Sequence, residues 1–187
     1  MVVEPVKTVR GRFIVVGLLL IAAALVWRAW VFRDVEPVPE RRAADATGAG
    51  LRPITLWFAS PDGENLVMEP RQLPEEYSLH ARVAVVVAAL AQGPREGGTR
   101  TLPEGTQVLH AYLDDSGLLT LDLSRAFRQG FPGGARAEEM TLASLVRTIA
   151  ANVPEVRRIR IVCAGAAVPS LGGHFPLDQP LDLDEWP

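Results

Sequence analysis

The sequence is poor in the residue types that most catalytic and metal-binding sites need. Its 187 residues include one cysteine and three histidines. A single cysteine, Cys163, excludes an intramolecular disulfide and any metal site built from several thiolates. Because Cys163 lies in an alternating apolar run, we expect it to be a small core residue.

The chain also lacks an excess of charge of one sign. Its formal net charge is −3 at pH 7. Domains that bind nucleic acids carry a basic field that attracts phosphates, so no nucleic-acid partner is expected. Apolar residues make up 48% of the chain, which is enough for one domain with a hydrophobic core.

A long uncharged run occurs once, near the N-terminus. Residues 13–27 carry no charge, and the run extends to Phe32 if the long side chain of Arg28 reaches the membrane interface. Trp27 and Trp30 are residues typical of that interface. The sequence therefore predicts a transmembrane anchor over residues 13–32.

The charges on either side of this segment predict its orientation. Basic residues precede it, whereas the first acidic residues after it follow closely. The positive-inside rule then places residues 1–12 in the cytoplasm and the C-terminal domain outside the cytoplasm. A cleaved signal peptide is the alternative, although its small-residue pair, Ala22 and Ala24, lies inside the apolar run.

The rest of the chain divides by composition. Residues 33–52 combine proline, alanine, glycine and charge without periodicity, which is typical of a flexible linker. The soluble domain is expected over residues 53–182, and an acidic tail over residues 183–187.

Apolar periodicity predicts an α+β domain, with one small mixed sheet of about five strands and two packed helices. The expected strands are 54–58, 66–73, 108–113, 119–123 and 158–163. The expected helices are 79–91, which Ser78 caps, and 137–153, whose first turn carries Glu138 and Glu139.

A glycine-rich stretch at residues 93–98 begins like the phosphate-binding loop G-x-x-x-x-G-K-[ST]. Thr99 and Arg100 stand where the lysine and the Ser/Thr are required. That loop also follows a strand, whereas a helix is expected before this one. No nucleotide partner is therefore expected. Gly93 is better interpreted as the residue that ends the helix, with Pro94 as the stop behind it.

Two further groups of residues carry weaker signals of chemistry. Ser170, His174 and Asp178 have the residue types of a hydrolase triad, but their closeness in sequence is the sole argument for one. Asp114 and Asp115 form an acidic turn without the alternating ligands of a calcium loop. We expect no cofactor and no metal.

Several motifs, in order, resemble the GerMN domain of sporulation and spore-germination proteins. They are Leu56-Trp57-Phe58, Glu69-Pro70-Arg71, Ala89-Leu90-Ala91-Gln92-Gly93-Pro94, Leu102-Pro103-Glu104-Gly105-Thr106, Leu121-Asp122-Leu123-Ser124 with Phe127, Leu145-Val146-Arg147-Thr148-Ile149, and the strand into Gly165. The resemblance covers residues 53–182. It implies a structural role for these family-motif positions: Gly93, Pro94, Pro103, Gly105, Thr106, Leu121, Leu123 and Gly165.

The resemblance implies a membrane-anchored, non-catalytic scaffold or interaction module of the cell envelope. Its expected partners are envelope proteins or the cell wall, and a homo-oligomer is a further expectation. Three residues are candidate partner contacts, namely Arg95, Arg100 and Trp57. Two alternatives stay open: a module that binds cell-wall glycan, and an envelope hydrolase using Ser170, His174 and Asp178.

Overall fold

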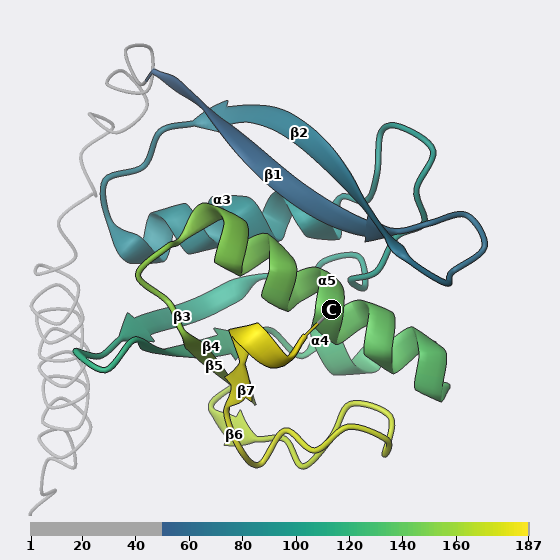
Figure 1. The fold of residues 1–187 in the computed structure, drawn as a ribbon. Helices are drawn as coiled ribbons and strands as arrows, with labels where there is room; N and C mark the ends of the chain where they lie inside the picture. The colour runs from purple at the N-terminus through teal and green to yellow at the C-terminus, as the bar shows by residue number, and fades with distance from the viewer. Residues whose placement is uncertain (1–49, 187) are drawn as a thin grey trace, which may run out of the picture. The chain divides into compact units, whose positions relative to one another are not determined.

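The computed structural model describes residues 50–186 (Figure 1). They belong to one compact unit, Ala49–Pro187. The predicted cytoplasmic segment (1–12), the predicted anchor (13–32) and most of the predicted linker (33–52) lie outside the described residues. Between residues 50 and 186, none of the helices has the length and apolar character that crossing a bilayer requires.

The elements confirm the α+β class. In chain order they are β1 (Leu51–Ala59), β2 (Leu66–Pro74), α3 (Leu79–Ala91), β3 (Val108–Leu113), β4 (Leu118–Leu123), α4 (Ala126–Gln129), α5 (Ala135–Asn152), β5 (Arg158–Cys163), β6 (Ala166–Ala167), β7 (Leu181–Asp182) and the 3-10 turn η2 (Leu183–Glu185). The predicted bounds of α3, β3 and β5 are confirmed. The short helix α4 was not predicted, and β1 starts at Leu51, ahead of the expected start of the domain.

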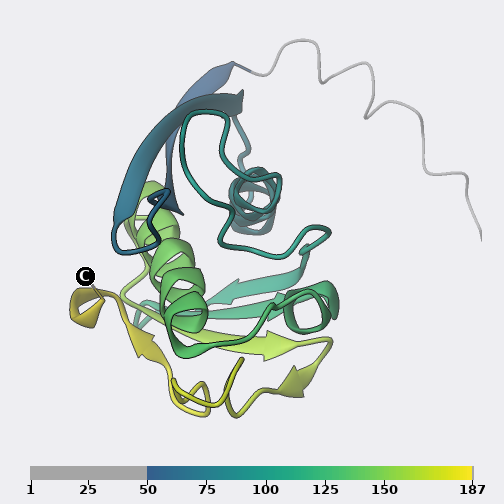
Figure 2. The ribbon, with the colours of Figure 1, turned by 90° about the vertical axis from the view of Figure 1, so that its right-hand side faces the viewer.

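The prediction of a single sheet is wrong. Strands β1 and β2 form an antiparallel sheet of their own. The larger sheet is mixed and has five strands, as expected, but its members are β3, β4, β5 and β6 in that order, with β7 beside β5. Strands β4 and β5 run parallel, with α5 as their crossover. Figure 2 shows α3 and α5 between the hairpin and the larger sheet.

A row of polar side chains on α5 explains why the hairpin stands apart. Ser144, Thr148 and Asn152 recur every fourth residue and are buried on one helix face. The Thr148 hydroxyl accepts from the Trp57 amide at 3.0 Å, and Ser144 donates to the Trp57 carbonyl. The Asn152 amide group both accepts from Thr55 N, at 3.0 Å, and donates to Thr55 O, at 2.6 Å. The helix therefore satisfies the strand edge that another strand would otherwise pair with.

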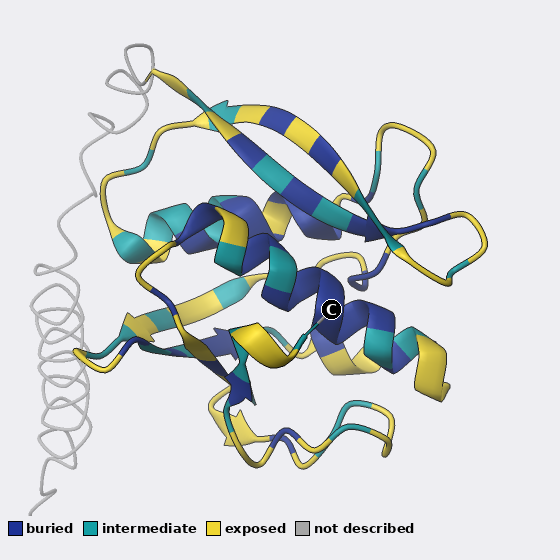
Figure 3. Cartoon of the chain, in the orientation of Figure 1, coloured by how far each residue is buried: buried dark blue, intermediate teal, exposed yellow. Residues whose placement is uncertain are grey.

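The hydrophobic core fills the space between these layers. Buried residues alternate with partly buried ones along β1 and with exposed ones along β2 (Figure 3), and the predicted inward leucines of β4 are fully buried. Cys163 is a buried core residue, as expected. At the C-terminus, the rings of Phe175 and Trp186 pack with centroids 5.6 Å apart, which docks the last turn onto the domain.

Candidate functional site

Two opposite charges occupy the core-facing side of the hairpin. The register pairs Glu69 with Leu56 and Arg71 with Ile54, so both charged side chains share the face of these apolar residues. The Arg71 Nε donates to Glu69 Oε1 at 2.6 Å. Their side chains are only 2% and 6% exposed for Arg71 and Glu69. Because a buried charge is stable only when it is paired and hydrogen-bonded, the remaining polar atoms of both groups need partners.

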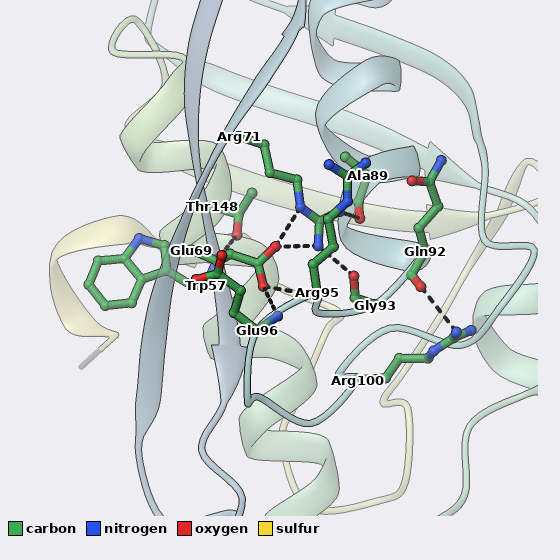
Figure 4. A network of polar contacts seen from close by, with 10 residues as sticks. All are labelled: Trp57, Glu69, Arg71, Ala89, Gln92, Gly93, Arg95, Glu96, Arg100 and Thr148. Carbon is green, nitrogen blue, oxygen red and sulfur yellow. Dashed lines mark hydrogen bonds and ion pairs between the residues drawn. The ribbon is translucent and has the colours of Figure 1, made fainter.

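Arg71 finds its remaining partners at the end of α3. It donates to the carbonyl of Ala89 at 3.0 Å and to the carbonyl of Gly93 at 2.6 Å. Its guanidinium also lies 5.4 Å from the centroid of the Phe58 ring. The last carbonyls of a helix lack intrahelical donors and carry partial negative charge. Arg71 therefore acts as a buried C-terminal cap of α3 (Figure 4).

Glu69 holds the segment that follows the helix. Its Oε2 accepts from the backbone amides of Arg95, at 2.9 Å, and Glu96, at 3.2 Å. Burial by itself would raise the pKa of Glu69, but these amides and the Arg71 guanidinium outweigh it and lower the pKa. Glu69-Pro70-Arg71 is one of the family motifs, and its spacing along the chain does not predict this role. The available signal was a pair of opposite charges two residues apart on a strand face that should be apolar.

The glycine-rich stretch at residues 93–98 is therefore a loop whose backbone is held by hydrogen bonds with Glu69 and Arg71; we call it the pinned loop. Gly93 has a φ of +87° directly behind α3, and β3 follows the loop, which confirms the helix-before-loop order that argued against a phosphate site. Arg95 and Arg100 are both exposed. Arg100 donates to the carbonyl of Gln92 at 3.1 Å and pairs with Glu104 at 3.2 Å. A role of Arg95 and Arg100 in partner binding stays a prediction.

The other family-motif residues lie in turns or in the core. Gly105 has a φ of +76°, and the hydroxyl of the buried Thr106 donates to the Pro103 carbonyl at 2.7 Å. Leu121 and Leu123 are buried in β4. Behind β5, Gly165 has a φ of +75° and its amide donates to Asp122 at 3.1 Å.

The proposed hydrolase residues are not joined by hydrogen bonds in the described part of the chain. His174 Nδ1 instead lies 3.1 Å from Glu138 Oε2, and neither Ser170 nor Asp178 contacts that ring through a hydrogen bond. Glu138 is wholly buried in the first turn of α5. Its place in the first turn, where the helix dipole favours an acidic residue, is as expected, but its contact with a loop is not predicted by the sequence.

Glu138 binds the backbone of this C-terminal loop. Its carboxylate accepts from the amides of Leu171, at 2.9 Å, and His174, at 3.0 Å, and from the amide of Gly172. Burial would raise the pKa of Glu138, but these amides and the His174 side chain lower it overall. By contrast, burial raises the pKa of the Cys163 thiol.

Trp57 borders an open groove on the other side of the hairpin. The groove has a volume of about 270 Å³ and is lined by Trp57, Glu64, Asn65, Leu66, Arg136, Glu139, Met140, Ala143 and Arg147. In Figure 4 the Trp57 indole points away from Arg71 and the pinned loop. Trp57 therefore does not share a surface with Arg95 and Arg100, although all three were candidate partner contacts.

A second hollow, larger than the groove beside Trp57, lies at the five-stranded sheet. It has a volume of about 440 Å³ and is lined by Arg125, Arg128, Gln129, Cys163, Ala164, Ala166 and Leu171.

The acidic turn at Asp114 and Asp115 is stabilised by local hydrogen bonds, since Asp114 Oδ1 accepts from the amides of Ser116, at 2.8 Å, and Leu118, at 3.0 Å. Among residues 50–186 no group of three or more His, Cys, Asp or Glu side chains is placed to hold a metal ion.

The fold of the described residues is similar to that of solved GerMN domains. The first GerMN domain of the sporulation protein GerM from Bacillus subtilis superposes with a TM-score of 0.55 at 15% identity, covering 72% of this chain and 99% of that one. The tandem GerMN domains of the same protein give 0.54 at 18% identity, covering 71% of this chain but only 46% of theirs. The fold thus defines a GerMN-type module.

The sequence supports the same assignment. The family model described as Germane, sporulation and spore germination, matches residues 55–168, so the chain belongs to this family. A candidate lipoprotein from Clostridium perfringens is similar at 25% identity, with a TM-score of 0.50, covering 73% of this chain and 90% of that one. No curated protein matches the sequence.

Proposed function

We propose that this protein is a non-catalytic interaction module of the cell envelope, held at the membrane by residues 13–32. One observation supports the non-catalytic part: the pKa values of three buried groups, Glu69, Glu138 and Cys163, are shifted away from those that catalysis needs. A general base works best with a pKa near the operating pH, whereas the pKa values of Glu69 and Glu138 are lowered. A nucleophilic cysteine needs a lowered pKa, whereas that of Cys163 is raised.

The buried carboxylates instead fix loops. Glu69 holds the backbone of residues 95 and 96, and Glu138 holds that of residues 171–174. Loops that a rigid scaffold holds in one conformation can bind a partner without first losing much conformational entropy. This supports a binding surface at the loop that carries Arg95 and Arg100.

The envelope location is supported by the apolar segment at residues 13–32, by the membership of the family and by the similarity to a candidate lipoprotein. We propose that residues 50–186 lie outside the cytoplasm. The chain offers a direct test because its one cysteine is buried. With Cys163 replaced by Ala and Glu64, which is exposed, replaced by Cys, a membrane-impermeant thiol reagent should label intact cells. Labelling only after lysis would contradict this orientation.

The interaction itself is tested by site-specific cross-linking in cells. A photoreactive residue is placed at Arg95 or Arg100 of the full chain, and at Tyr77, which is 89% exposed, as the control. The proposal expects a discrete adduct with an envelope protein from the loop positions. A ladder of the protein's own multiples would identify the partner as a second copy. Adducts no stronger than those from Tyr77 would contradict a partner surface at this loop.

A further inference from the structure

The groove beside Trp57 is built by two segments far apart in the sequence. One side comes from the hairpin, with Trp57 on β1, Glu64 and Asn65 in its turn and Leu66 at the start of β2. The other side comes from residues 136–147 of α5. Trp57 is not one of the residues that face the core from β1. Ile54, Leu56 and Phe58 face the core from β1, and Trp57 lies between them on the opposite face.

The apolar part of the groove is compact. Met140 and Ala143 are buried beside it, and Leu66 is half-buried. The guanidinium of Arg147 lies 5.8 Å from the centroid of the Trp57 ring, so the indole is held by stacking as well as by its strand. A fixed, partly exposed aromatic ring provides a flat apolar surface at a low cost in side-chain entropy.

The polar part of the groove is balanced in charge. Arg136 and Arg147 contribute two positive charges, and Glu64 and Glu139 two negative ones. Arg136 already pairs with Glu139 at 2.8 Å. A strongly charged ligand would therefore gain little net attraction here and would lose its hydration. Asn65 and the carboxylates and guanidinium groups instead offer donors and acceptors close together.

The size limits the occupant further. Ligand sites usually enclose ~300–1,000 Å³, so a groove of about 270 Å³ suits one ring rather than a long segment. A sugar ring combines an apolar C–H face with a rim of neutral hydroxyl groups. This is the complement of a flat indole surrounded by charge-balanced donors and acceptors.

We propose that the Trp57 groove binds a neutral pyranose ring of a glycan, with the C–H face of the sugar on the indole and its hydroxyls on Asn65, Glu64 and Arg136. Binding of the sugar does not depend on where the chain resides. Only the source of the glycan, as a polymer of the envelope, rests on the function proposed above.

The test uses the full chain, purified in a detergent without a sugar headgroup. Saturation-transfer NMR and calorimetry measure binding of tri-N-acetylchitotriose, a neutral glycan. Trp57→Ala should weaken the affinity at least about tenfold, because most of the apolar contact is lost. Leu51→Ala is the control, since Leu51 is 67% exposed at the other end of β1 and does not line the groove; it should leave the affinity unchanged.

A second variant guards against loss of folding in Trp57→Ala. Asn65 is exposed at the hairpin turn, so Asn65→Ala should keep the fold, as thermal unfolding checks, and should weaken binding about threefold or more. The proposal is overturned if the neutral trisaccharide does not bind at millimolar concentration, if Trp57→Ala and Asn65→Ala bind it unchanged, or if a polyanionic glycan binds more tightly. If the trisaccharide does not bind but a cross-linked envelope partner is found at Arg95, the sugar site is disproved and the proposed interaction module is retained.

Discussion

Two buried glutamates in this domain each hold a loop by its backbone, but their negative charges are stabilised in different ways. Glu69 and Glu138 are 5% and 0% exposed, and each accepts hydrogen bonds from backbone amides of a loop distant in sequence. Glu69 is paired with Arg71, which is buried with it. The side-chain partner of Glu138 is His174, which is 46% exposed and carries a charge only when protonated.

The difference shows two means of stabilising a buried negative charge. At Glu69 a permanent positive charge is buried as well, and this charge also serves the end of α3. At Glu138 three amides and the positive end of the α5 dipole stabilise the carboxylate. The first site therefore combines two backbone amides with a buried counter-charge, that of Arg71, whereas the second has no buried counter-charge and relies mainly on backbone amides.

The largest effect is expected from Arg71→Met. It leaves the Glu69 carboxylate buried without its counter-charge and the end of α3 without its cap. We expect a loss of ~3–5 kcal/mol in the free energy of unfolding, measured by urea denaturation. Arg82→Met is the control, because Arg82 pairs with the half-exposed Glu155; this change should cost less than about 1 kcal/mol. Equal losses in the two variants would contradict a special role of the buried pair.

The second-largest loss of stability is expected from Glu138→Gln. Glutamine keeps the size of the side chain but has one acceptor oxygen, so its NH2 group would face an amide donor. We expect a loss of ~1–3 kcal/mol and faster hydrogen exchange at the amides of Leu171 and His174. Glu139→Gln, in the same helical turn but partly exposed, should change neither quantity much.

Low pH should reduce the contribution of Glu69 and Glu138 to the free energy of unfolding. The pKa values of Glu69 and Glu138 are lowered in the folded state, below the ordinary glutamate value of ~4.3. Their contribution is therefore complete above that value and is lost as the pH falls through it and then through the folded pKa values. The free energy of unfolding should fall less steeply in this acid range for Glu138→Gln than for the wild type. Parallel curves would contradict the lowered pKa of Glu138.

The smallest effect is expected from His174→Ala. Three backbone amides remain on Glu138 when this half-exposed ring is removed, so the loss of stability should stay below about 1 kcal/mol. The variant also separates the function classes, because an interaction module should still form its envelope adducts. If a hydrolytic activity were found and His174→Ala abolished it, the non-catalytic proposal would be wrong.

Local patterns were sufficient for most individual elements. Helix α3 was predicted with its bounds, because its apolar positions recur at helical spacing between Ser78 and Gly93. The cap is confirmed, as the Ser78 hydroxyl accepts from Ala81 N at 3.2 Å. Strand β5 is predicted by its alternation, and β3 by the turn that joins it to β4. By contrast, α4 (Ala126–Gln129) spans about one helical turn, so no apolar periodicity can develop within it to predict a helix.

The sequence by itself determined the class of the domain, the order of its main helices and strands, and the family, because these depend on local periodicity and ordered motifs. Only the tertiary structure decided which groups distant in the chain meet. It showed that Ser144, Thr148 and Asn152 replace a neighbouring strand for β1, that Arg71 caps α3, and that Trp57 faces α5 across a groove. Such contacts depend on how whole elements pack, and the spacing of residues along one element carries no information about its partner.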